Sequence, residues 1–269
     1  ATGAPDSPEP EAGERYLSAW AAKNFAAMHR ELNEASRRTV SRAELAAAYR
    51  TAAETATLRG LDPGDPGDTE STDGTTLVPI PVTVTTAAFG SFEAELVLPY
   101  ADGGIAWDAS LVFPGLRSGE QLANEVELAE RAPILARDGS ALAEGPAGAR
   151  KHPLGSAAID VTGEIGTAEP GDLEAQARQG FPPETPVGVS GLEQAFNRRL
   201  AGKPGGSLLA VREADGATRT LARSEPRAGA PVKTTIDPDL QEAAVAALAG
   251  RAGGVAVLDA RKGDVRALA

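Results

Sequence analysis

The first part of the chain carries apolar residues at helical spacing. Over residues 12–32 they recur every three or four positions, which predicts one buried helix face. Lys23 and Asn24 indicate a break between two shorter helices. The residues on the predicted face are Leu17, Trp20, Ala21, Asn24, Met28 and Leu32.

A further helix has a distinct start signal. Ser41 and Glu44 have the spacing of a capping box, in which the serine hydroxyl and the glutamate carboxylate each accept a free backbone N–H. The apolar stripe that follows consists of Leu45, Tyr49, Ala52 and Ala56. Residues 60–76 are rich in Gly, Pro and Asp, which predicts a loop.

From residue 77 to residue 113 the pattern changes to alternation, which predicts β-strands. The alternating apolar residues are Ile80, Val82 and Val84 in the first strand and Phe92, Ala94, Leu96 and Leu98 in the second. Turns are predicted at residues 90–91 and 102–104, because both contain glycine.

Two prolines qualify the first of these strands. Pro79 and Pro81 favour an edge position or a late start, because proline cannot donate a hydrogen bond to a neighbouring strand. Helices followed by an antiparallel sheet predict an α+β unit in which the helices cover one sheet face. This unit is expected to end near Pro114.

The middle of the chain, residues 116–231, has only short periodic segments. The predicted segments are a strand or short helix at 119–130, two short strands around Asp138-Gly139 within 131–145, a strand at 155–166, a short helix with a loop at 167–188, a helix at 189–202, and a hairpin at 207–226 that turns at Asp215-Gly216. In the helix at 189–202, Leu192, Phe196 and Leu200 share one face, and a glycine ends the helix.

The end of the chain predicts a helix followed by a two-stranded hairpin. Asp237 is expected at the N-cap and Pro238 at the first helical position, where a missing N–H costs nothing. The predicted buried stripe consists of Leu240, Ala244, Ala247 and Leu248. Residues 255–258 form a continuous apolar run, typical of a strand buried on both faces, and residues 264–269 return after a turn.

The composition argues against several classes of protein. The chain of 269 residues has a formal net charge of −12, which disfavours a nucleic-acid partner and an anionic membrane surface. It has no cysteine, so disulfides, thiolate metal sites and cysteine nucleophiles are excluded. His29 and His152 are far apart in the sequence, so we expect no metal centre and no cofactor. No run of about 18 apolar residues exists that could span a membrane.

Three segments resemble motifs of the penicillin-binding proteins. Residues 234–269, with TTIDPDLQEAAVAALAG and GGVAVLDARKGDVRALA, are similar to the opening of their transpeptidase domain. GVSGLEQAFNRRLAGKPG, residues 188–205, resembles the Gly-Leu-Glu motif of the non-catalytic pedestal in class B members. RAPILARDGSALA, residues 131–143, resembles the pedestal motif of the same class, which usually has Gly at Ala132 and Asp at Ala136.

The N-terminal unit resembles the NTF2-like domain that precedes the pedestal in some class B proteins, through its helices, its sheet and the segment WDASLVFPGL. The resemblance implies three parts: an NTF2-like domain at 1–115, a pedestal or dimerisation domain at 116–231, and the beginning of the transpeptidase domain at 232–269. The expected fold class is therefore α+β, an NTF2-like cone of helices on an antiparallel sheet followed by an extended strand-rich pedestal and a stub of the transpeptidase domain.

The resemblance implies the non-catalytic N-terminal portion of a peptidoglycan D,D-transpeptidase, a protein that binds penicillin by serine acylation. The family acylates through Ser-x-x-Lys, Ser-x-Asn and Lys-Thr-Gly motifs, and none of the three occurs here. We therefore expect this chain not to be an enzyme. We also expect it to be a fragment cut just inside the transpeptidase domain, with a Pro/Gly/Glu-rich lead before residue 12 that looks like a linker or a cut end.

The resemblance also implies a location and partners. The whole protein would be held at the extracytoplasmic face of the bacterial membrane by an N-terminal anchor that this chain lacks. The expected partners are cell-wall assembly proteins and the missing transpeptidase domain, with no nucleic acid. Two alternatives stay open: a complete but catalytically dead interaction protein, and a small-molecule-binding regulatory module that uses the NTF2-like cavity.

The resemblance points to five candidate structural contacts of the pedestal: Arg131, Arg137, Asp138, Gly191 and Glu193. Ser190 and Glu193 also have the spacing of a capping box, which alone would account for the glutamate. A second hypothesis adds an ion pair between Glu193 and Arg131 that joins two distant segments.

Two further features have both a functional and a structural interpretation. Trp20 and Trp107 could line a ligand cavity, but buried aromatic residues usually fill the core between helix and sheet. An acidic loop could bind Ca²⁺, but it lacks the ligand order of an EF-hand, which favours a solvated loop. Its acidic residues are Asp62, Asp65, Asp68, Glu70 and Asp73.

Overall fold

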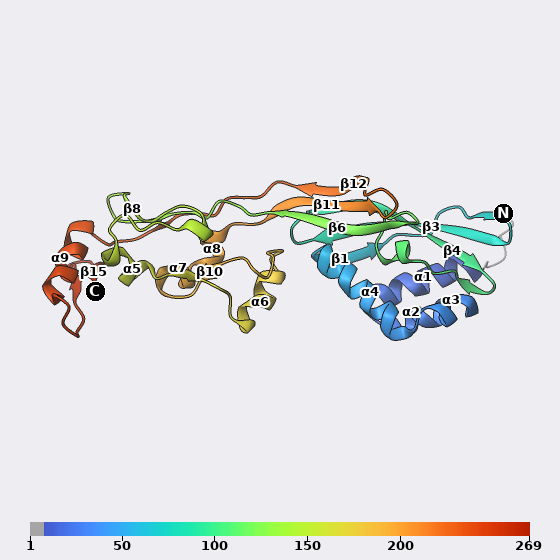
Figure 1. Ribbon diagram of the computed structural model, residues 1–269, viewed down its shortest axis with the longest axis horizontal. Helices are drawn as coiled ribbons and strands as arrows, with labels where there is room; N and C mark the ends of the chain where they lie inside the picture. The colour runs from blue at the N-terminus through green and yellow to red at the C-terminus, as the bar shows by residue number, and fades with distance from the viewer. Residues whose placement is uncertain (1–7) are drawn as a thin grey trace. The chain divides into compact units, whose positions relative to one another are not determined.

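The computed structural model describes residues 8–269, and their contacts divide the chain into two units. Unit 1 comprises the chain up to Glu125 together with Gly206–Ser224, and unit 2 comprises Val126–Gly205 and Glu225–Ala269. Figure 1 labels many of the elements of both units. The hairpin at 206–224 is thus assigned to unit 1, and the predicted domain boundaries after residues 115 and 231 stay predictions. Most of the predicted lead lies in residues 1–7, outside the described residues.

Unit 1 begins with helices. They are α1 (Pro8–Ala21), α2 (Phe25–Glu31), α3 (Glu34–Thr39) and α4 (Arg42–Thr55). The predicted break between the first two is confirmed, since Lys23 has a φ of 55° and the Asn24 side chain accepts a hydrogen bond from Ala27 N. The capping box of α4 is also confirmed, with Ser41 N donating to Glu44 Oε2 at 2.8 Å.

An antiparallel sheet follows the helices. Its strands are β1 (Leu58–Pro63), β2 (Glu70–Thr72), β3 (Thr75–Thr86), β4 (Ser91–Ala101) and β5 (Gly104–Ile105). The order is β1-β3-β4-β5, and β2 also pairs with β3. The predicted alternation is confirmed, because the inward residues of β3 are buried: Val78, Ile80, Val82 and Val84.

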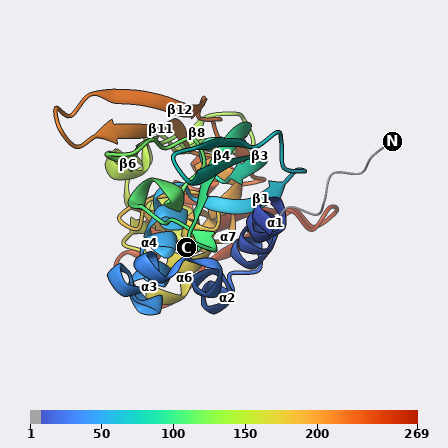
Figure 2. The same cartoon turned by 90° about the vertical axis from the view of Figure 1, so that its right-hand side faces the viewer.

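Helices cover one face of this sheet, as the pattern predicted. Figure 2 shows α1 and α4 on one side of β1, β3 and β4. The contact is close, because a methyl group on Gly13 of α1 would come within 2.9 Å of Ile80 Cδ1 and 3.5 Å of Leu98 Cδ1. Glycine at this position therefore lets the helix lie directly on the two longest strands, and unit 1 is an α+β fold.

The edge position predicted from Pro79 and Pro81 is wrong, because β3 has neighbours on both sides. The loop between β1 and β2 makes this possible. Gly67 N donates to Pro79 O at 2.8 Å, and Gly64 N donates to Pro81 O at 2.8 Å. This loop lies along the side of β3 on which Pro79 and Pro81 lack an N–H. The loop donates its own N–H groups and needs only the proline carbonyls as acceptors, so the two missing N–H groups leave no hydrogen bond unmade.

Aromatic residues fill the space between the helices and the sheet. The Tyr16 and Tyr49 hydroxyls lie 2.5 Å apart, and Tyr49 donates to Leu111 O at 2.9 Å. Burial raises the pKa of both tyrosines above the ordinary value of 10.0. Trp20 is buried and meets Tyr49 edge-on with ring centroids 4.7 Å apart, so it is a core residue. Trp107 is half-buried, and a cavity-lining role for it stays a prediction.

A second sheet of unit 1 has the order β12-β11-β6. Its strands are β6 (Glu120–Glu127), β11 (Gly205–Arg212) and β12 (Thr218–Ser224), and a short 3₁₀ helix η1 (Ala109–Val112) precedes them. The predicted hairpin with its turn at Asp215-Gly216 is confirmed. Arg219 Nη2 lies 2.6 Å from Glu120 Oε2. Through this hydrogen bond, Arg219 holds the pKa of Glu120 below its ordinary value.

Unit 2 is built from short elements. They are β7 (Ile134–Leu135), β8 (Ala141–Ala143), η2 (Ala147–Ala149), α5 (Ser156–Thr162), β9 (Ile165–Gly166), α6 (Pro170–Ala177), β10 (Val187–Gly188), α7 (Gly191–Ala195), α8 (Asn197–Ala201), β13 (Val232–Lys233), α9 (Pro238–Leu248), β14 (Ala256–Leu258) and β15 (Val265–Leu268). The sheets have the orders β13-β7-β8, β10-β9 and β14-β15. The core around β7 includes Ile134, Leu142, Leu200, Val232 and Ile236.

Two predictions for unit 2 are wrong. Residues 156–162 form helix α5 rather than a strand, with Ala157 and Ala158 on its buried face. The prediction failed because an apolar run this short fits the period of a helix as well as that of a strand. The helix expected at 189–202 is two short helices, α7 and α8, with Phe196 between them. Phe196 is 40% exposed rather than on a buried face.

The end of the chain combines one confirmed and one wrong prediction. Asp237 caps α9 by accepting from Leu240 N, and Pro238 is the first helical residue. The buried strand at 255–258 is wrong, because β14 pairs with β15 alone among the described strands and Leu258 is 59% exposed. Leu240 is also exposed, whereas Ala244 of the predicted stripe is buried.

Candidate functional site

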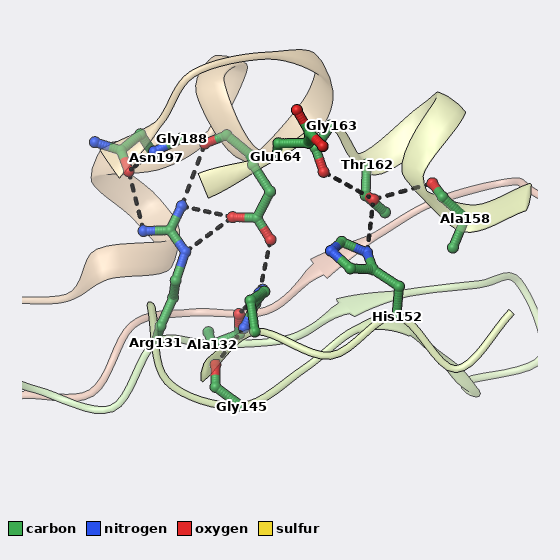
Figure 3. A network of polar contacts seen from close by, with 12 residues as sticks. Arg131, Ala132, Gly145, His152, Ala158, Thr162, Gly163, Glu164, Gly188 and Asn197 are labelled. Carbon is green, nitrogen blue, oxygen red and sulfur yellow. Dashed lines mark hydrogen bonds and ion pairs between the residues drawn. The ribbon is translucent and has the colours of Figure 1, made fainter. Parts of the chain in front are cut away.

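Arg131 and Glu193 form a buried ion pair in unit 2. Arg131 precedes β7, whereas Glu193 lies on α7, 62 positions later. Arg131 donates through Nη2 and Nε to Glu193 Oε2 at 2.6 and 2.8 Å, and the side chains are 2% and 0% exposed. Arg131 Nη1 donates to Asn197 Oδ1 at 3.0 Å (Figure 3). The structure thus brings together two residues that the sequence placed far apart.

Arg150 binds the other oxygen of the same carboxylate. Its Nε donates to Glu193 Oε1 at 2.8 Å, and its side chain is 4% exposed. Its remaining nitrogens donate to Gly145 O at 2.7 Å and to Ala132 O at 2.8 Å. We call Arg131, Arg150 and Glu193 the buried triad. It connects the segment before β7, the segment before α5 and helix α7.

The buried triad carries two positive charges and one negative charge. Burial lowers the pKa of Arg131, and the charge of Glu193 opposes that shift. Arginine nevertheless stays protonated at neutral pH. Removing three charges from water is costly unless every group finds partners. Here the surplus guanidinium donors meet backbone carbonyls and the Asn197 amide oxygen, so the net positive charge is fully hydrogen-bonded.

Glycines allow the backbone to close around the buried triad. A methyl group on Gly188 would overlap the Glu193 carbonyl, so β10 lies against α7 only because residue 188 has no side chain. Gly191, one of the predicted contacts, has a φ of 54° at the start of α7 and packs against Gly163. A methyl group on Gly163 would overlap the Ser190 carbonyl. These close backbone contacts at the three glycines fix the residue at which α7 begins.

The capping box predicted from Ser190 and Glu193 is wrong. Ser190 is the N-cap residue of α7, but its side chain makes no capping hydrogen bond. Instead, Ser190 Oγ accepts from Glu164 N at 3.0 Å. The Glu193 carboxylate is occupied by two guanidinium groups, and hydrogen bonds between charged groups are stronger than a bond to one backbone N–H.

A second polar contact appears in the same view (Figure 3). His152 Nδ1 lies 3.1 Å from Thr162 Oγ1, and that hydroxyl lies 2.9 Å from Ala158 O. Thr162 is buried at the end of α5, whereas His152 is half-buried in the segment before the helix. The contact holds the two ends of this helical segment together.

The remaining predicted contacts, Arg137 and Asp138, lie beside the start of α9. Arg137 donates from Nη1 to Asp237 Oδ2 at 3.0 Å and from its backbone N to Ile236 O at 2.9 Å. Asp138 closes the turn between β7 and β8 by accepting from Ser140 N and Oγ at 2.9 and 2.7 Å. The hydrogen bond from Arg137 lowers the pKa of Asp237, and those from Ser140 lower the pKa of Asp138.

Arg150 and Asn197 were not among the predicted contacts. Arg150 belongs to none of the motifs, whereas Asn197 lies inside the segment 188–205 that resembles the Gly-Leu-Glu motif, although its own role was not predicted. Asn197 Oδ1 accepts from Gly188 N at 3.1 Å as well as from Arg131, so it joins β10 to the network. Arg150 lies 43 positions from Glu193. No local spacing indicates which arginine will meet a glutamate at that separation.

The described residues also bear on the other chemical interpretations. All five acidic residues of the predicted loop are exposed, but the loop prediction is wrong in part, because Asp62 lies in β1 and Glu70 in β2. Within residues 8–269, no three His, Asp or Glu side chains are grouped so that they could hold a metal ion. The same stretch contains no helix with the length and apolar character needed to cross a membrane.

Two family descriptions match the chain. The NTF2-like N-terminal transpeptidase domain matches residues 7–120, and the penicillin-binding protein dimerisation domain matches residues 145–234. The matched segments follow the order that the sequence motifs indicated. Arg150 and Glu193 of the buried triad lie within the second match.

Curated relatives match a smaller part of the chain. The peptidoglycan D,D-transpeptidase MrdA of Acinetobacter baumannii is 28% identical over 119 residues, which are 44% of this chain and 18% of that protein. The protein of the same name from Salmonella typhimurium is 29% identical over 123 residues, which are 44% of this chain and 20% of that protein. The matched regions therefore span about a fifth of the length of these relatives.

Two solved structures are similar in part. The crystal structure of Pseudomonas aeruginosa PBP2 in complex with WCK 5153 is 24% identical, with a TM-score of 0.41 over 55% of this chain and 30% of that one. A complex between penicillin-binding protein PBP2 and MreC from Helicobacter pylori is 17% identical, with a TM-score of 0.46 over 55% of this chain and 43% of that one.

Proposed function

We propose, from the premise that this chain belongs to the class B penicillin-binding proteins as their NTF2-like and dimerisation region, that it positions the catalytic domain of a peptidoglycan D,D-transpeptidase. The whole protein would acylate a serine in another domain, and this chain would carry no part of that chemistry. The order of the two family matches supports this assignment. So does the lack of all three serine-acylase motifs from the sequence.

The observation that carries the proposal is the buried triad. It joins three separate segments of unit 2 through hydrogen-bonded ion pairs, and its three side chains are almost completely buried. A buried ion pair contributes little net stability compared with apolar packing, but one unpaired member is strongly unfavourable. The triad therefore favours one arrangement of these segments over all others. A domain that holds another domain in place requires such a single arrangement.

A second set of contacts extends to the segment that resembles the start of the transpeptidase domain. Gln241 on α9 is buried, and its Nε2 donates to Ala157 O on α5 at 2.9 Å and to Leu268 O at 2.8 Å. Its Oε1 accepts from Leu268 N at 2.8 Å. With the ion pair between Arg137 and Asp237, these bonds would transmit the position of unit 2 to the catalytic domain.

We further propose that the whole protein works at the extracytoplasmic face of the bacterial membrane, held by an N-terminal anchor, and that it contacts cell-wall assembly proteins. The support is that the curated relatives are peptidoglycan D,D-transpeptidases. Peptidoglycan lies outside the cytoplasmic membrane, so an enzyme that cross-links it must act there.

The positioning role is tested with the longer natural protein and its Glu193→Gln variant. Two activities are compared at a temperature at which circular dichroism shows the variant to be folded. Acylation by a soluble penicillin needs only the catalytic domain, and we expect it to be unchanged. Cross-linking of membrane-bound glycan strands also needs correct placement of that domain, and we expect it to fall. Equal cross-linking by the two proteins would overturn the positioning role.

A further inference from the structure

A hollow of about 340 Å³ lies on unit 2 beside strand β13. Its lining residues are Phe196, Arg199, Pro231, Val232 and Lys233. Phe196 lies between α7 and α8 and leaves 40% of its surface exposed. The hollow thus combines an accessible aromatic ring with two cationic side chains.

The strand beside the hollow has a free edge. β13 pairs in parallel with β7 and is the outer strand of its sheet. Val232 N donates to Pro133 O at 3.1 Å, and Thr234 N donates to Leu135 O at 2.9 Å. Lys233, between them, therefore turns its N–H and C=O away from β7, and no residue among 8–269 accepts or donates a hydrogen bond there. A free strand edge is a template for another extended segment.

The hollow has two cations in its lining, Arg199 and Lys233. Three further cations lie on α8 or in the segments between α8 and β13: Arg198, Lys203 and Arg227. All five are exposed, and none forms an ion pair with an acidic residue in the described part of the chain. The chain as a whole has a net charge of −12. A local group of unpaired cations on such a chain fits a negatively charged partner.

We propose that this hollow binds an extended acidic segment of a partner protein that carries alternating apolar residues and adds a strand beside β13. Lys233 would form two main-chain hydrogen bonds with that segment. Side chains alternate along an extended segment, so one set would meet the Phe196 ring and the other would face Arg199 and Lys233. The proposal deepens the partner contact in the proposed function and rests on it.

The probe is a capped, fluorescein-labelled nine-residue peptide of alternating Glu and Phe, titrated against the 269-residue chain. We expect saturable binding by fluorescence anisotropy and a chemical-shift change at the Lys233 backbone amide. A peptide with Lys in place of Glu should bind at least about tenfold more weakly, because its positive charges repel the cations of the hollow. A Glu/Phe peptide methylated on its backbone nitrogens should lose binding as well, since it cannot donate to the free edge.

Variants separate the hollow from general charge attraction. Arg199→Glu and Lys233→Glu should each weaken peptide binding about tenfold, and Phe196→Ala should weaken it too. Lys262→Glu makes the same charge change on an exposed turn far from the hollow in sequence and should leave binding unchanged. Circular dichroism of each variant establishes that it is folded before binding is compared.

Two outcomes would overturn the proposal. One is unchanged binding by Arg199→Glu and Lys233→Glu. The other is that polyglutamate binds as tightly as the Glu/Phe peptide and leaves the chemical shift of the Lys233 backbone amide unchanged. That result would mean that charge attraction alone accounts for the binding. Failure here is distinct from failure of the proposed function, because penicillin acylation of the longer protein is measured on another domain. Acylation without peptide binding would reject the docking site only.

Discussion

The Glu193 carboxylate lies 2.6 Å from the guanidinium of Arg131, although 62 positions separate the two residues in the sequence. Both side chains are almost completely removed from water. Because Arg150 takes the second carboxylate oxygen, Glu193 is the single anion that offsets two buried cations. Removing the charge of Glu193 would therefore leave both cations without an anionic partner.

Replacing Glu193 by Gln removes the negative charge and leaves Arg131 and Arg150 facing each other without water. We expect the free energy of unfolding to fall by about 3–5 kcal/mol, the usual cost of removing one member of a buried ion pair. Urea unfolding, followed by circular dichroism, measures it. The matched control is Glu174→Gln, which breaks an exposed pair with Arg178 and should change stability by less than about 0.5 kcal/mol. Similar losses in both variants would contradict the account.

Exchanging the charges of Arg131 and Glu193 should restore only part of the lost stability. In Arg131→Glu with Glu193→Lys, the new lysine would lie beside the Arg150 guanidinium, and these like charges repel. Adding Arg150→Met removes that repulsion and should increase the recovery. A double-mutant cycle of unfolding free energies tests this. Full recovery in the double variant would show that Arg150 is not coupled to the pair.

Gly188→Ala should destabilise the protein through packing alone. The added methyl group would overlap the Glu193 carbonyl, and β10 and α7 must separate to accommodate it. We expect a loss of about 1–3 kcal/mol or more, as in other overpacked cores. Gly171→Ala is the control, since nothing lies within 4 Å of its added methyl group on α6 and alanine favours a helix. A Gly188→Ala variant as stable as the natural chain would refute the close contact.

Stability should fall in acid partly through Glu120. The hydrogen bond from Arg219 holds its folded pKa below the ordinary value of 4.5. The unfolded chain therefore binds the proton first as the pH falls, so the stabilisation is complete above the unfolded pKa and is lost as the pH drops through the folded pKa. Glu120→Gln should flatten this loss, measured by urea unfolding at a series of pH values. Glu70→Gln, on exposed β2, is the control for removing one carboxylate. Parallel pH curves for the natural chain and Glu120→Gln would disprove the contribution.

Local chemistry explains the elements that the sequence predicted well. Ser41 with Glu44 and Asp237 with Pro238 specify helix starts within four residues, and the structure confirms both. The turn at Asp215-Gly216 is specified in the same way. Such signals depend on neighbours in the chain, so they hold where no distant charged group competes for the capping side chain.

The wrong predictions depend on distant neighbours. Pro79 and Pro81 are tolerated inside the sheet because a loop supplies N–H donors on their side, which no pattern within β3 indicates. The strand at 255–258 was inferred from its apolar run, yet Leu258 is largely exposed. Burial on two faces requires other elements above and below a strand, and the run itself cannot reveal them.

The candidate site also combines contacts that the sequence indicated with contacts that depend on distant residues. Arg131 and Glu193 were proposed as partners from the resemblance of two motifs. Arg150 was not, since it is recruited from a loop without a motif and its partner lies 43 positions away. The expected cap at Ser190 failed for a related reason, because the charge of a distant guanidinium outcompeted a local backbone N–H for the carboxylate.

The central claim, that this chain is the non-catalytic portion of a penicillin-binding transpeptidase, is tested most directly by acylation with a fluorescent penicillin. The 269-residue chain and the longer natural protein are incubated with it side by side, denatured and compared by gel fluorescence. The account predicts a labelled band for the longer protein and none for residues 1–269. Labelling of the 269-residue chain itself, or of neither protein, would contradict it.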